Sequence, residues 1–493
     1  MEPTPTNPPM LRSIAGSDSG GCAGLQADLK TWQALQCHGT TVVTAVTAQN
    51  ATGVRGINPV PPDMVAAQLA ALGGERPPAA IKTGMLHDAR TVRIVADSLT
   101  EDGPPVVCDP VLAASTGHSL QSDDLVAAIR RYLLPRVHLL MPNIPEAEAL
   151  TGRPIRSRQE VMAAAGQLLE TGAERVLIKG GHLEDGEPGL VGDYYLDDDG
   201  GFWIVGEQRQ GEFHGSGCSF AAAVCAGLGT GLGAVDAIIR GRLWLAQQMR
   251  WPVRTGPGRP ALRPQALAPR PDDMPWICTG DWHRPQEFPA FGEEPPGLYP
   301  IVDRAAWLER LLPLGVRTAQ IRIKDLQGTA LEEELARAIA TARQHHCRLF
   351  VNDHWREAIR LGAWGVHLGQ EDLETADRSV LLRSGLRLGI STHCYEEAAI
   401  ARAWSPSCIA IGPVFPTTCK SMAFGPRGIA MATSWVPMFS CPVVGIGGLK
   451  PDHVPELMDQ GIAGMAVISD ILEHDDPEGR TRQWLQKMPG LSG

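Results

Sequence analysis

The run Thr318-Ala-Gln-Ile-Arg-Ile-Lys324 predicts a strand with two different faces. Its polar residues Gln320, Arg322 and Lys324 alternate with two isoleucines, so the polar side chains share one face and the isoleucines share the other. A helical stretch follows at Leu331–His345. The segment therefore reads as one unit of a β/α repeat.

The same unit recurs through the second half of the chain. Eight strand candidates fall within residues 296–493, and helical stretches such as Pro451–Gln460 separate them. They are Leu298–Asp303, Thr318–Ile323, Cys347–Asp353, Gly365–Gly369, Arg387–Thr392, Cys408–Val414, Pro442–Gly448 and Gly464–Ser469. Eight such units predict a small (β/α)8 TIM barrel, in which the chemistry lies at the carboxyl ends of the strands.

Cationic side chains follow the second predicted strand. Arg322 and Lys324 on an inner face need an anion nearby, because an unpaired buried charge is costly. A bound anionic ligand meets that need, and so does an internal salt bridge to Asp303 or Asp325. The pattern alone leaves both interpretations open.

Two neighbouring strands end in carboxylates, in Asn352-Asp353 and in Gln370-Glu-Asp372. Carboxylates from adjacent strand ends suit Mg2+, which completes its shell with water and phosphate oxygens. Pro416-Thr-Thr-Cys-Lys420 adds hydroxyl groups and a cation. Gly445-Ile-Gly-Gly448 and Val467-Ile-Ser469 end the last two strands, where barrels commonly bind phosphate.

Strand-like and helix-like segments also alternate before residue 250. The expected strands are Arg12–Asp18, Thr41–Asn50, Ala80–Met85, Pro105–Leu112, Val137–Asn143 and Arg175–Gly181. Between the first two, Leu25, Leu29, Trp32 and Leu35 recur at helical spacing. This alternation predicts a largely parallel sheet covered by helices.

Two segments of the first half are modest candidates for ligand binding. Ala15-Gly-Ser-Asp-Ser-Gly-Gly-Cys-Ala-Gly24 follows a strand and opens a helix, so its glycines allow a ligand to approach the backbone closely. Asn143-Ile-Pro-Glu146 follows another strand. Its carboxylate can hold a metal-bound water over phosphates, or the segment is an ordinary helix start with an acidic first turn.

The segment His214-Gly-Ser-Gly-Cys-Ser219 is a stronger candidate. Its glycines lead into an apolar helix expected at Phe220–Val235, where free N–H groups and the helix dipole make an anion hole suited to a phosphoryl group. The same field lowers the pKa of a thiol in the first turn, so Cys218 can act as a base or charge stabiliser. The alternative is a buried structural cysteine in a glycine-capped helix.

Composition and charge narrow the function classes. The 493 residues carry 44 Lys and Arg against 55 Asp and Glu, and the net charge of -11 argues against wrapping a nucleic-acid backbone. Eleven irregularly spaced cysteines without CxxC pairs favour a reducing cytoplasm over a disulfide framework or a zinc site. The polar, proline-rich start predicts no secretory signal, and the 16-residue apolar run Phe220–Val235 is short for a membrane span.

A proline-rich seam separates the two halves. Residues Trp251–Pro296 hold 11 of the 40 prolines, so no regular core element is expected there. We expect a first domain at 8–265, a semi-extended linker at 266–295 and a second domain at 296–493. Aromatic residues in the seam suggest that parts of it dock on a domain: Trp276, Trp282 and Phe288.

Over about residues 11–251, the first half resembles the bifunctional hydroxymethylpyrimidine/phosphomethylpyrimidine kinases of thiamine biosynthesis, in the ribokinase-like superfamily. The matching runs are Ala15-Gly-Ser-Asp18, Ala23-Gly-Leu-Gln-Ala-Asp-Leu-Lys30, Thr44-Ala-Val-Thr-Ala-Gln-Asn50, Lys82-Thr-Gly-Met-Leu86, Cys108-Asp-Pro-Val111, Pro142-Asn-Ile-Pro-Glu146, Leu177-Ile-Lys-Gly-Gly-His182 and His214-Gly-Ser-Gly-Cys218. The resemblance implies a ribokinase-like α/β sandwich that phosphorylates the pyrimidine alcohol and then its monophosphate with MgATP.

The kinase resemblance also implies residue roles. The implied site comprises Asp18, Gln49 and Met85 at the pyrimidine, Asp109 and Glu146 near Mg2+, Asn143 and Lys179 at the ATP phosphates, and Gly215, Ser216, Gly217 and Cys218 as the anion hole, with Cys218 in the base position. Relatives that act on pyridoxal usually carry Asp at that last position, so the cysteine favours the pyrimidine substrate.

The second half resembles thiamine-phosphate synthase over about residues 297–472. The matching runs are Gln320-x-Arg-x-Lys324, Val351-Asn-Asp353, Val366-His-Leu-Gly-Gln-Glu-Asp372, Gly412-Pro-Val-Phe-Pro-Thr417, Lys420 and Val444-Gly-Ile-Gly-Gly448. The resemblance implies an enzyme that joins hydroxymethylpyrimidine pyrophosphate to a thiazole phosphate and releases pyrophosphate. The implied site comprises Arg322, Lys324, Asn352 and Lys420 at the pyrophosphate, Asp353 and Asp372 at Mg2+, Gln320, Ser391 and Thr417 as ligand contacts, and Gly447, Gly448 and Ser469 at the thiazole phosphate.

These expectations together describe a bifunctional cytoplasmic enzyme of thiamine biosynthesis. It would use ATP as co-substrate together with Mg2+, and its other substrates would be small molecules. No binding to nucleic acid or membrane is expected, and the sequence is compatible with a homo-oligomer. The alternatives for the second half are a thiazole tautomerase-like barrel and a non-catalytic regulatory barrel that binds thiamine phosphate. The Gln-x-Arg-x-Lys set and the two aspartates favour the synthase, because an isomerase has no pyrophosphate to bind.

Overall fold

The computed structural model describes residues 7–112, 122–181, 183, 187–416, 425–426 and 428–488. The chain forms two compact units, Met1–His283 and Arg284–Gly493. Each unit has its own sheet, and each is described below by itself.

The first unit is built on a sheet with the strand order β10-β9-β8-β7-β6-β5-β4-β1-β2-β3. Its strands are β1 Met10–Asp18, β2 His38–Asn50, β3 Gly53–Pro59, β4 Ala80–Thr83, β5 Val106–Cys108, β6 Leu139–Leu140, β7 Val176–Ile178, β8 Leu190–Asp197, β9 Gly200–Glu207 and β10 Trp276–Cys278. Strands β1, β2 and β4 to β7 run parallel, as expected from the sequence. Strands β3, β8, β9 and β10 pair antiparallel and were not expected.

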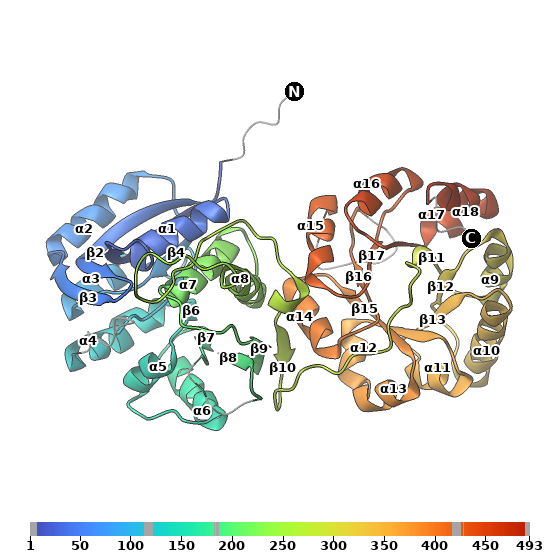
Figure 1. The fold of residues 1–493 in the computed structure, drawn as a ribbon, viewed down its shortest axis with the longest axis horizontal. Helices are drawn as coiled ribbons and strands as arrows, with labels where there is room; N and C mark the ends of the chain where they lie inside the picture. The colour runs from blue at the N-terminus through green and yellow to red at the C-terminus, as the bar shows by residue number, and fades with distance from the viewer. Residues whose placement is uncertain are drawn as a thin grey trace. The chain divides into compact units, whose positions relative to one another are not determined.

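Helices cover this sheet. They are α1 Gly24–Ala34, α2 Pro62–Ala71, α3 Ala89–Asp97, α4 Asp123–Ala128, α5 Ile144–Thr151, α6 Arg158–Leu169, α7 Ser216–Gly229 and α8 Ala234–Gln248. Helices α1 and α7 pack on each other and on β1, and α6 packs on β7 and β8 (Figure 1). The α/β sandwich expected from the sequence is confirmed.

Helix α7 differs from the helix expected at Phe220–Val235. It begins at Ser216, inside the glycine-rich turn, and ends at Gly229. Gly231 then adopts a φ of 88°, which an α-helix cannot continue through. Along its length α7 is almost entirely buried, because it packs against α1, α8 and the sheet.

The second unit is a closed barrel of parallel strands in the order β11 to β18 (Figure 1). The strands are β11 Gly297–Val302, β12 Thr318–Ile321, β13 Arg348–Asn352, β14 Gly365–Leu368, β15 Arg387–Thr392, β16 Cys408–Ile411, β17 Val443–Ile446 and β18 Gly464–Val467. Each matches one of the eight expected strands. The expected (β/α)8 barrel is therefore confirmed.

The barrel helices lie outside the ring of strands (Figure 1). They are α9 Ala305–Leu311, α10 Gly328–Gln344, α11 Trp355–Leu361, α12 Gln370–Thr375, α13 Arg378–Ser384, α14 Tyr395–Trp404, α15 Gly428–Ser434, α16 Val454–Asp459, α17 Ser469–Leu472 and α18 Pro477–Gln486. The barrel interior includes Tyr299, Phe350 and Val444, all fully buried.

The expectation that the proline-rich seam holds no core element is wrong. Strand β10 lies in it and pairs with β9, so that Trp276 is buried opposite Val205. Trp282 is also buried and packs edge-on against Trp203, with ring centroids 4.9 Å apart. Although the segment is rich in proline, the apolar residues Trp276–Cys278 are free of it, so they can pair as a short strand at the edge of the sheet.

The end of the seam belongs to the second unit. Phe291 stacks on Phe350 in the barrel core, with ring centroids 6.0 Å apart. The backbone N–H of Phe288 donates to the carbonyl of Ser405 at 3.1 Å. The boundary between the compact units thus falls in the sequence between His283 and Arg284, inside the segment expected as the linker.

We predict that fragments 1–283 and 284–493 fold separately, whereas fragment 1–265 is much less stable than 1–283. Cutting at 265 removes the buried Trp276 and Trp282, and the loss of one large buried aromatic side chain costs about 3–5 kcal/mol. Thermal unfolding followed by circular dichroism measures the difference, which we expect to be about 10 °C or more. Equal melting temperatures would show that β10 and Trp282 contribute nothing to the first unit.

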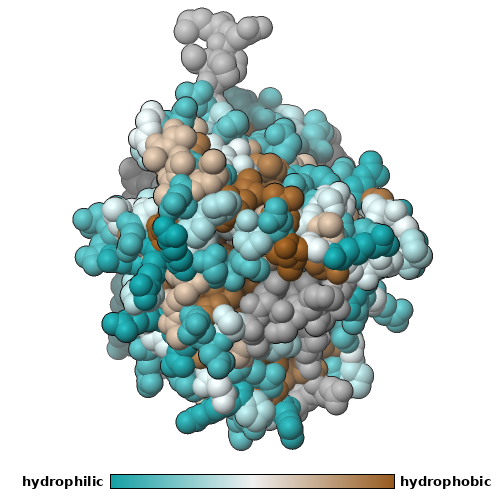
Figure 2. Space-filling view, turned by 90° about the vertical axis from the view of Figure 1, so that its left-hand side faces the viewer, coloured by the Kyte–Doolittle hydropathy of each residue, from teal (hydrophilic) through white to brown (hydrophobic). Residues whose placement is uncertain are grey.

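Hydrophilic and hydrophobic side chains are unevenly distributed on the face that Figure 2 shows. Figure 2 shows one face of the first unit, on which hydrophobic side chains gather near the centre and hydrophilic ones surround them. Within the part of the chain that the structure describes, we find no helix whose length and apolar character would let it cross a membrane.

Candidate active sites

The parallel strands of the first unit bring a charged cluster to their carboxyl ends. Lys179, after β7, donates to the Asp109 carboxylate at 2.6 Å, and Asp109 follows β5. Glu146 follows β6, and burial raises its pKa to about 7, with the nearby Lys179 opposing and Asp109 reinforcing the shift. Two carboxylates thus lie near one partly buried lysine.

The Asn143-Ile-Pro-Glu146 segment also forms the helix start that was the alternative interpretation. Asn143 caps α5 by accepting from the Glu146 backbone N–H at 2.9 Å, and Glu146 accepts from the Asn143 backbone N–H at 2.8 Å. This capping box fixes the buried Glu146 carboxylate beside Asp109 and Lys179. The cap and the charged cluster therefore use the same side chain.

The glycine turn before α7 brings the residues expected to form an anion hole close to Lys179 of this cluster. Gly215 adopts a φ of 76°, and a Cβ there would lie 1.8 Å from the Cys22 carbonyl oxygen, so only glycine fits. A Cβ at Gly217 would lie 3.5 Å from the Lys179 ammonium nitrogen. The backbone of Ser216 opens α7, whose free N–H groups face the same region.

The expected lowering of the Cys218 pKa is wrong. Burial raises the pKa of this thiol to about 12, although Lys82 acts in the opposite direction. Loss of solvation therefore outweighs the helix dipole at this position. Cys218 is a neutral thiol at physiological pH, and it also donates a hydrogen bond that helps to lower the pKa of the buried Asp109.

A buried ion pair that the sequence did not reveal supports the same site. Lys82 at the end of β4 contacts both oxygens of Asp28 at 3.0 Å, and neither side chain is exposed. Ser13 donates to the same carboxylate at 2.5 Å. Burial opposes the charge on Lys82, but Asp28 and the nearby Asp109 raise its pKa.

Asp18 is occupied inside its own glycine-rich loop. Its carboxylate accepts from the backbone N–H groups of Gly20, Cys22 and Ala23 at 2.7, 2.8 and 2.7 Å. Burial acts to raise its pKa, but these bonds and His214 lower it to about 2. Asp18 therefore shapes the loop, and it is not among the residues that line the adjacent cavity.

A small cavity of about 70 Å³ lies beside this loop. Two of the residues expected at the pyrimidine, Gln49 and Met85, line it together with Cys218, Lys82 and His214. Its wall also includes four apolar side chains: Ala15, Val54, Ile57 and Val111. The wall thus places a thiol and an ammonium group beside apolar side chains.

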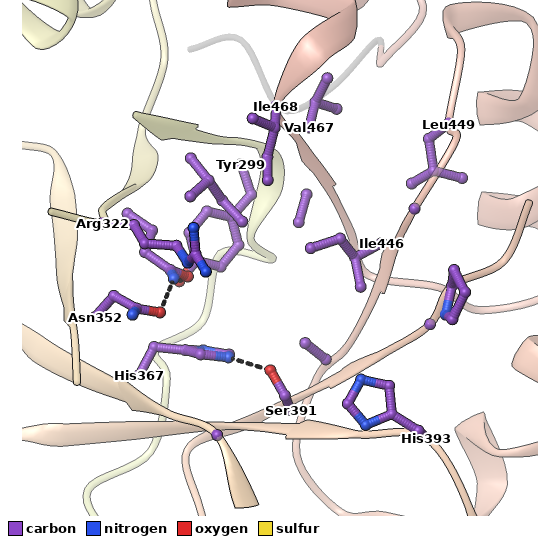
Figure 3. A pocket seen from close by; sticks show the side chains of 18 of the residues that line it. Tyr299, Arg322, Asn352, His367, Ser391, His393, Ile446, Leu449, Val467 and Ile468 are labelled. Carbon is purple, nitrogen blue, oxygen red and sulfur yellow. Dashed lines mark hydrogen bonds between the residues drawn. The ribbon is translucent and has the colours of Figure 1, made fainter. Parts of the chain in front are cut away.

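The barrel of the second unit opens into a cavity of about 500 Å³ at the carboxyl ends of its strands (Figure 3). It is lined by all the described residues that the sequence selected there: Gln320, Arg322, Lys324, Asn352, Asp353, Asp372, Ser391, Gly447, Gly448 and Ser469. The neighbouring Ile321 and Ile323 are buried, so the predicted alternation is confirmed. The expected residues Thr417 and Lys420 lie outside the described residues.

The cationic wall of the barrel does not use the internal salt bridges considered from the sequence. Asp325 pairs with Arg304, away from the cavity, and Lys324 donates to Asp353. Burial and the neighbouring Asp353 raise the pKa of Asp372. Two carboxylates that destabilise each other's charge are suited to a shared cation.

The two aspartates fit Mg2+, which in proteins often takes only one or two carboxylates and completes its shell with water and substrate oxygens. Asp353 adopts a φ of 61°, a left-handed conformation that Asp and Asn tolerate better than most residues. Among the described residues, the structure shows no group of three or more His, Cys, Asp or Glu side chains that could hold a metal without a substrate.

A chain of hydrogen bonds crosses the floor of the barrel cavity. Tyr299 donates to Gln320 at 3.3 Å, and Gln320 donates to Asn352 at 2.7 Å. His367 approaches Ser391 with Nε2 2.9 Å from the hydroxyl oxygen (Figure 3). Burial lowers the pKa of His367 to about 4, although Asp353 acts in the opposite direction, so the ring is neutral at physiological pH.

We predict that His367 makes the barrel less stable in mild acid. Its pKa falls from the ordinary 6.5 to about 4 on folding, so between these values the unfolded chain binds a proton that the folded chain does not. Stability from this residue is present above pH 6.5 and is lost as pH falls, by about 2 kcal/mol between pH 7 and 5. Urea unfolding of 284–493 at both pH values measures the loss, which His367→Gln should remove; an equal loss in the variant would assign it to other groups.

On the side of the barrel cavity formed by the ends of β17 and β18, glycines allow a ligand to approach the backbone closely. A Cβ at Gly448 would lie 2.5 Å from the Pro416 carbonyl oxygen, and the residue adopts a φ of 62°. Ser469 begins α17 beside Asp470, which accepts from Lys450 at 2.7 Å and from Arg480 at 2.8 Å. This network anchors the end of β18 at the cavity.

Sequence reasoning missed several residues of both sites, since they carry no motif signal of their own. They are Asp28 and Lys82 in the first unit, and Tyr299, His367, His393, Glu397 and Lys450 in the second. Lys82 and His367 lie within quoted runs of sequence, but no spacing rule shows that they face a cavity.

Comparisons with known proteins agree with the division into two units. Residues 18–262 match the family model of phosphomethylpyrimidine kinase, and residues 298–471 match that of thiamine monophosphate synthase. The thiamine-phosphate synthase of Cronobacter sakazakii is 47% identical over 191 residues, which cover 38% of this chain and 91% of that protein.

Solved structures resemble the first unit. A pyridoxal kinase from Staphylococcus aureus is 28% identical with a TM-score of 0.50, and the match covers 56% of this chain and 100% of that chain. A phosphomethylpyrimidine kinase from Clostridium difficile is 31% identical with a TM-score of 0.43, covering 48% of this chain and 98% of that chain.

Proposed function

Because this chain belongs to the thiamine-phosphate synthase family and carries a ribokinase-like phosphomethylpyrimidine kinase domain ahead of that barrel, we propose how its two sites act in sequence. The first unit phosphorylates hydroxymethylpyrimidine and then its monophosphate. The second couples the pyrimidine pyrophosphate to thiazole phosphate, which gives thiamine phosphate and pyrophosphate. The observation that carries this proposal is the barrel cavity, which joins a cationic wall, two aspartates and a glycine-lined wall.

In the kinase unit, the pyrimidine ring binds against Gln49 and Met85 with its alcohol directed at Cys218. Phosphoryl transfer needs positioning and charge stabilisation more than a strong base, which suits a neutral thiol. The N–H groups of the Gly215–Cys218 turn bind the oxygens of the phosphoryl group during its transfer, and Lys179 faces the phosphates of ATP. Asn143 positions Glu146 by capping α5, and Asp109 and Glu146 would hold Mg2+, which supplies charge neutralisation when bound.

In the barrel unit, Arg322, Lys324 and Asn352 bind the pyrophosphate of the substrate, and Gln320 and Ser391 contact the pyrimidine. Asp353 and Asp372 would hold Mg2+, which supplies further positive charge at the leaving group when bound. The bond between the pyrimidine methylene and the pyrophosphate oxygen breaks with its electrons moving to that oxygen. The thiazole nitrogen then forms the new bond to the methylene carbon.

Gly447, Gly448 and Ser469 bind the phosphate of the thiazole partner, at the strand ends where barrels commonly bind phosphate. A tautomerase or a regulatory barrel would need neither the cationic wall nor the two aspartates. Thr417 would contact the ligand and Lys420 the pyrophosphate, as the family resemblance implies.

Each half-reaction has its own test. Purified protein with hydroxymethylpyrimidine, ATP and Mg2+ should form the pyrimidine pyrophosphate, detected by phosphorus NMR. Purified protein with pyrimidine pyrophosphate, thiazole phosphate and Mg2+ should form thiamine phosphate without ATP. Absence of either product removes the corresponding activity from the proposal.

A further inference from the structure

Lys450 is a cationic residue of the barrel cavity to which nothing above assigns a role in binding. It follows β17 and comes two residues after Gly448, and Figure 3 shows the preceding residue, Leu449, at the cavity wall. Asp470, which comes directly after Ser469, lines the same cavity. The Lys450 ammonium donates to the Asp470 carboxylate at 2.7 Å, so this bond links the segments that follow β17 and β18.

Asp470 is also held by two donors that are not among the described residues lining the cavity, Arg480 and Trp484. Arg480 donates to one carboxylate oxygen at 2.8 Å and to the other at 2.9 Å, and the indole N–H of Trp484 donates at 2.8 Å. Burial acts to raise the pKa of Asp470, but hydrogen bonds from Arg480, Lys450 and Trp484 lower it overall. The carboxylate is therefore ionised and fixed at the cavity edge.

The Asp470 carboxylate does not depend on Lys450 for its hydrogen bonds, because both of its oxygens already accept from Arg480. The Lys450 side chain is 57% exposed, whereas that of Arg480 is only 19% exposed. An ion pair as open to water as that of Lys450 contributes little to stability. An ammonium group has three N–H donors and the bond to Asp470 uses one, so the others can bind an anion in the cavity.

The described residues that we expect at the thiazole phosphate have no charged side chain: Gly447, Gly448 and Ser469. The cations expected at the pyrophosphate, Arg322 and Lys324, follow β12, and β11 and β18 lie between that strand and β17 in the barrel. A phosphate monoester carries about −1.5 to −2 charges at neutral pH. Lys450 thus brings a positive charge to the end of β17, where the glycines offer only backbone N–H groups.

We propose that the Lys450 ammonium binds the phosphate of the thiazole partner while it keeps its bond to Asp470. This inference rests on the proposed synthase function and adds to it the side chain that recognises the charge of the acceptor. The N–H groups of Gly447 and Gly448 and the hydroxyl of Ser469 bind the phosphate oxygens. Lys450 adds a charge-assisted hydrogen bond, which is about twice as strong as one between neutral groups.

Steady-state kinetics of the coupling reaction on the full-length protein test this contact, with each substrate varied in turn. We expect Lys450→Met to raise KM for thiazole phosphate by about tenfold or more, and to change kcat by less than about threefold, because the phosphate is remote from the reacting nitrogen. KM for the pyrimidine pyrophosphate should stay at the wild-type value. Lys450→Arg, which keeps the positive charge, should raise KM for thiazole phosphate less than Lys450→Met does.

Asp470→Asn separates the proposed contact from a purely structural role of the ion pair. If the pair mattered only because it links two segments of the cavity edge, its loss from either side would have the same effect. The proposal instead predicts that Asp470→Asn, which keeps the ammonium group, raises KM for thiazole phosphate less than Lys450→Met does. An equal or larger increase in folded Asp470→Asn would assign the effect to the link and contradict the contact.

Lys487→Met is the matched control. Lys487 lies in the same unit, is 3.7 Å from Asp452 and is 50% exposed, but it is not among the residues that line the cavity. Melting temperatures report on folding, and Lys450→Met should melt close to the wild-type protein, since its ion pair is exposed.

A wild-type KM for thiazole phosphate in folded Lys450→Met would overturn the inference alone. An increase confined to KM for the pyrimidine pyrophosphate would also overturn it, because it would place the lysine at the leaving group. A wild-type protein that forms no thiamine phosphate from the two substrates with Mg2+ would overturn the proposed synthase function together with it.

Discussion

Asp353→Asn is expected to lower the coupling of pyrimidine pyrophosphate to thiazole phosphate by roughly 100-fold or more, while phosphorylation of the pyrimidine alcohol continues at the wild-type rate. The substitution removes one of two carboxylates from the proposed Mg2+ site and leaves Lys324 without its partner. Asn tolerates the left-handed φ of 61° that this position requires, so the backbone should be preserved.

Initial rates of both reactions over a range of Mg2+ concentrations check this prediction. Asp325→Asn is a matched control, because Asp325 is close in sequence but pairs with Arg304 outside the cavity. The control should keep the wild-type Mg2+ dependence. The same dependence in Asp353→Asn would remove Asp353 from the metal site.

Cys218→Ala should produce the largest loss in the other unit. We expect both phosphorylation steps to fall on the order of 100-fold, with the coupling reaction unchanged, because the thiol lines the cavity in which we propose that the substrate alcohol binds beside the glycine turn. Cys218→Ser keeps a hydrogen-bond donor of similar size and should retain more activity than the alanine variant. Alcohol phosphorylation within a few-fold of wild type in Cys218→Ala would make the cysteine structural.

The protonation state of the Cys218 thiol can be tested separately by its rate of alkylation. Because burial raises its pKa to about 12, Cys218 should react with iodoacetamide at pH 8 more slowly than a free cysteine peptide does. Mass spectrometry of the alkylated protein resolves it from the other cysteines. Faster reaction than the peptide would show that the helix dipole prevails over burial.

The barrel could be predicted closely from the sequence because one physical pattern repeats in it. Buried apolar strands alternate with helices throughout it, and the predicted bounds of β15, Arg387–Thr392, are those observed. The cavity residues followed, since parallel strands place their carboxyl ends at one rim. Arg322 and Asp353 meet there although they come from different strands.

The first unit was harder to predict at its edges. Strands β8 and β9 form a hairpin whose glycines and aspartates read as loop, and β10 is three residues within proline-rich sequence. Their stability comes from pairing with one another and from packing around Trp203, which no local pattern reveals.

Side-chain partners and electrostatics were the least predictable features. Asp28 and Lys82 are 54 residues apart in sequence, and only the fold shows that they form a buried pair. Cys218 illustrates a competition of effects, since its position at a helix N-terminus predicts a lowered pKa and its burial raises it. The His393–Glu397 pair spans four residues of sequence, yet spacing alone could not show that it borders the cavity.

The central claim is that one chain converts the pyrimidine alcohol into thiamine phosphate. The direct measurement incubates the purified full-length protein with hydroxymethylpyrimidine, ATP, Mg2+ and thiazole phosphate, and follows the products by chromatography. The account predicts thiamine phosphate together with ADP and pyrophosphate, and accumulation of pyrimidine pyrophosphate when thiazole phosphate is omitted. Consumption of ATP with pyrimidine pyrophosphate as the end product, and no thiamine phosphate when all substrates are present, would contradict it.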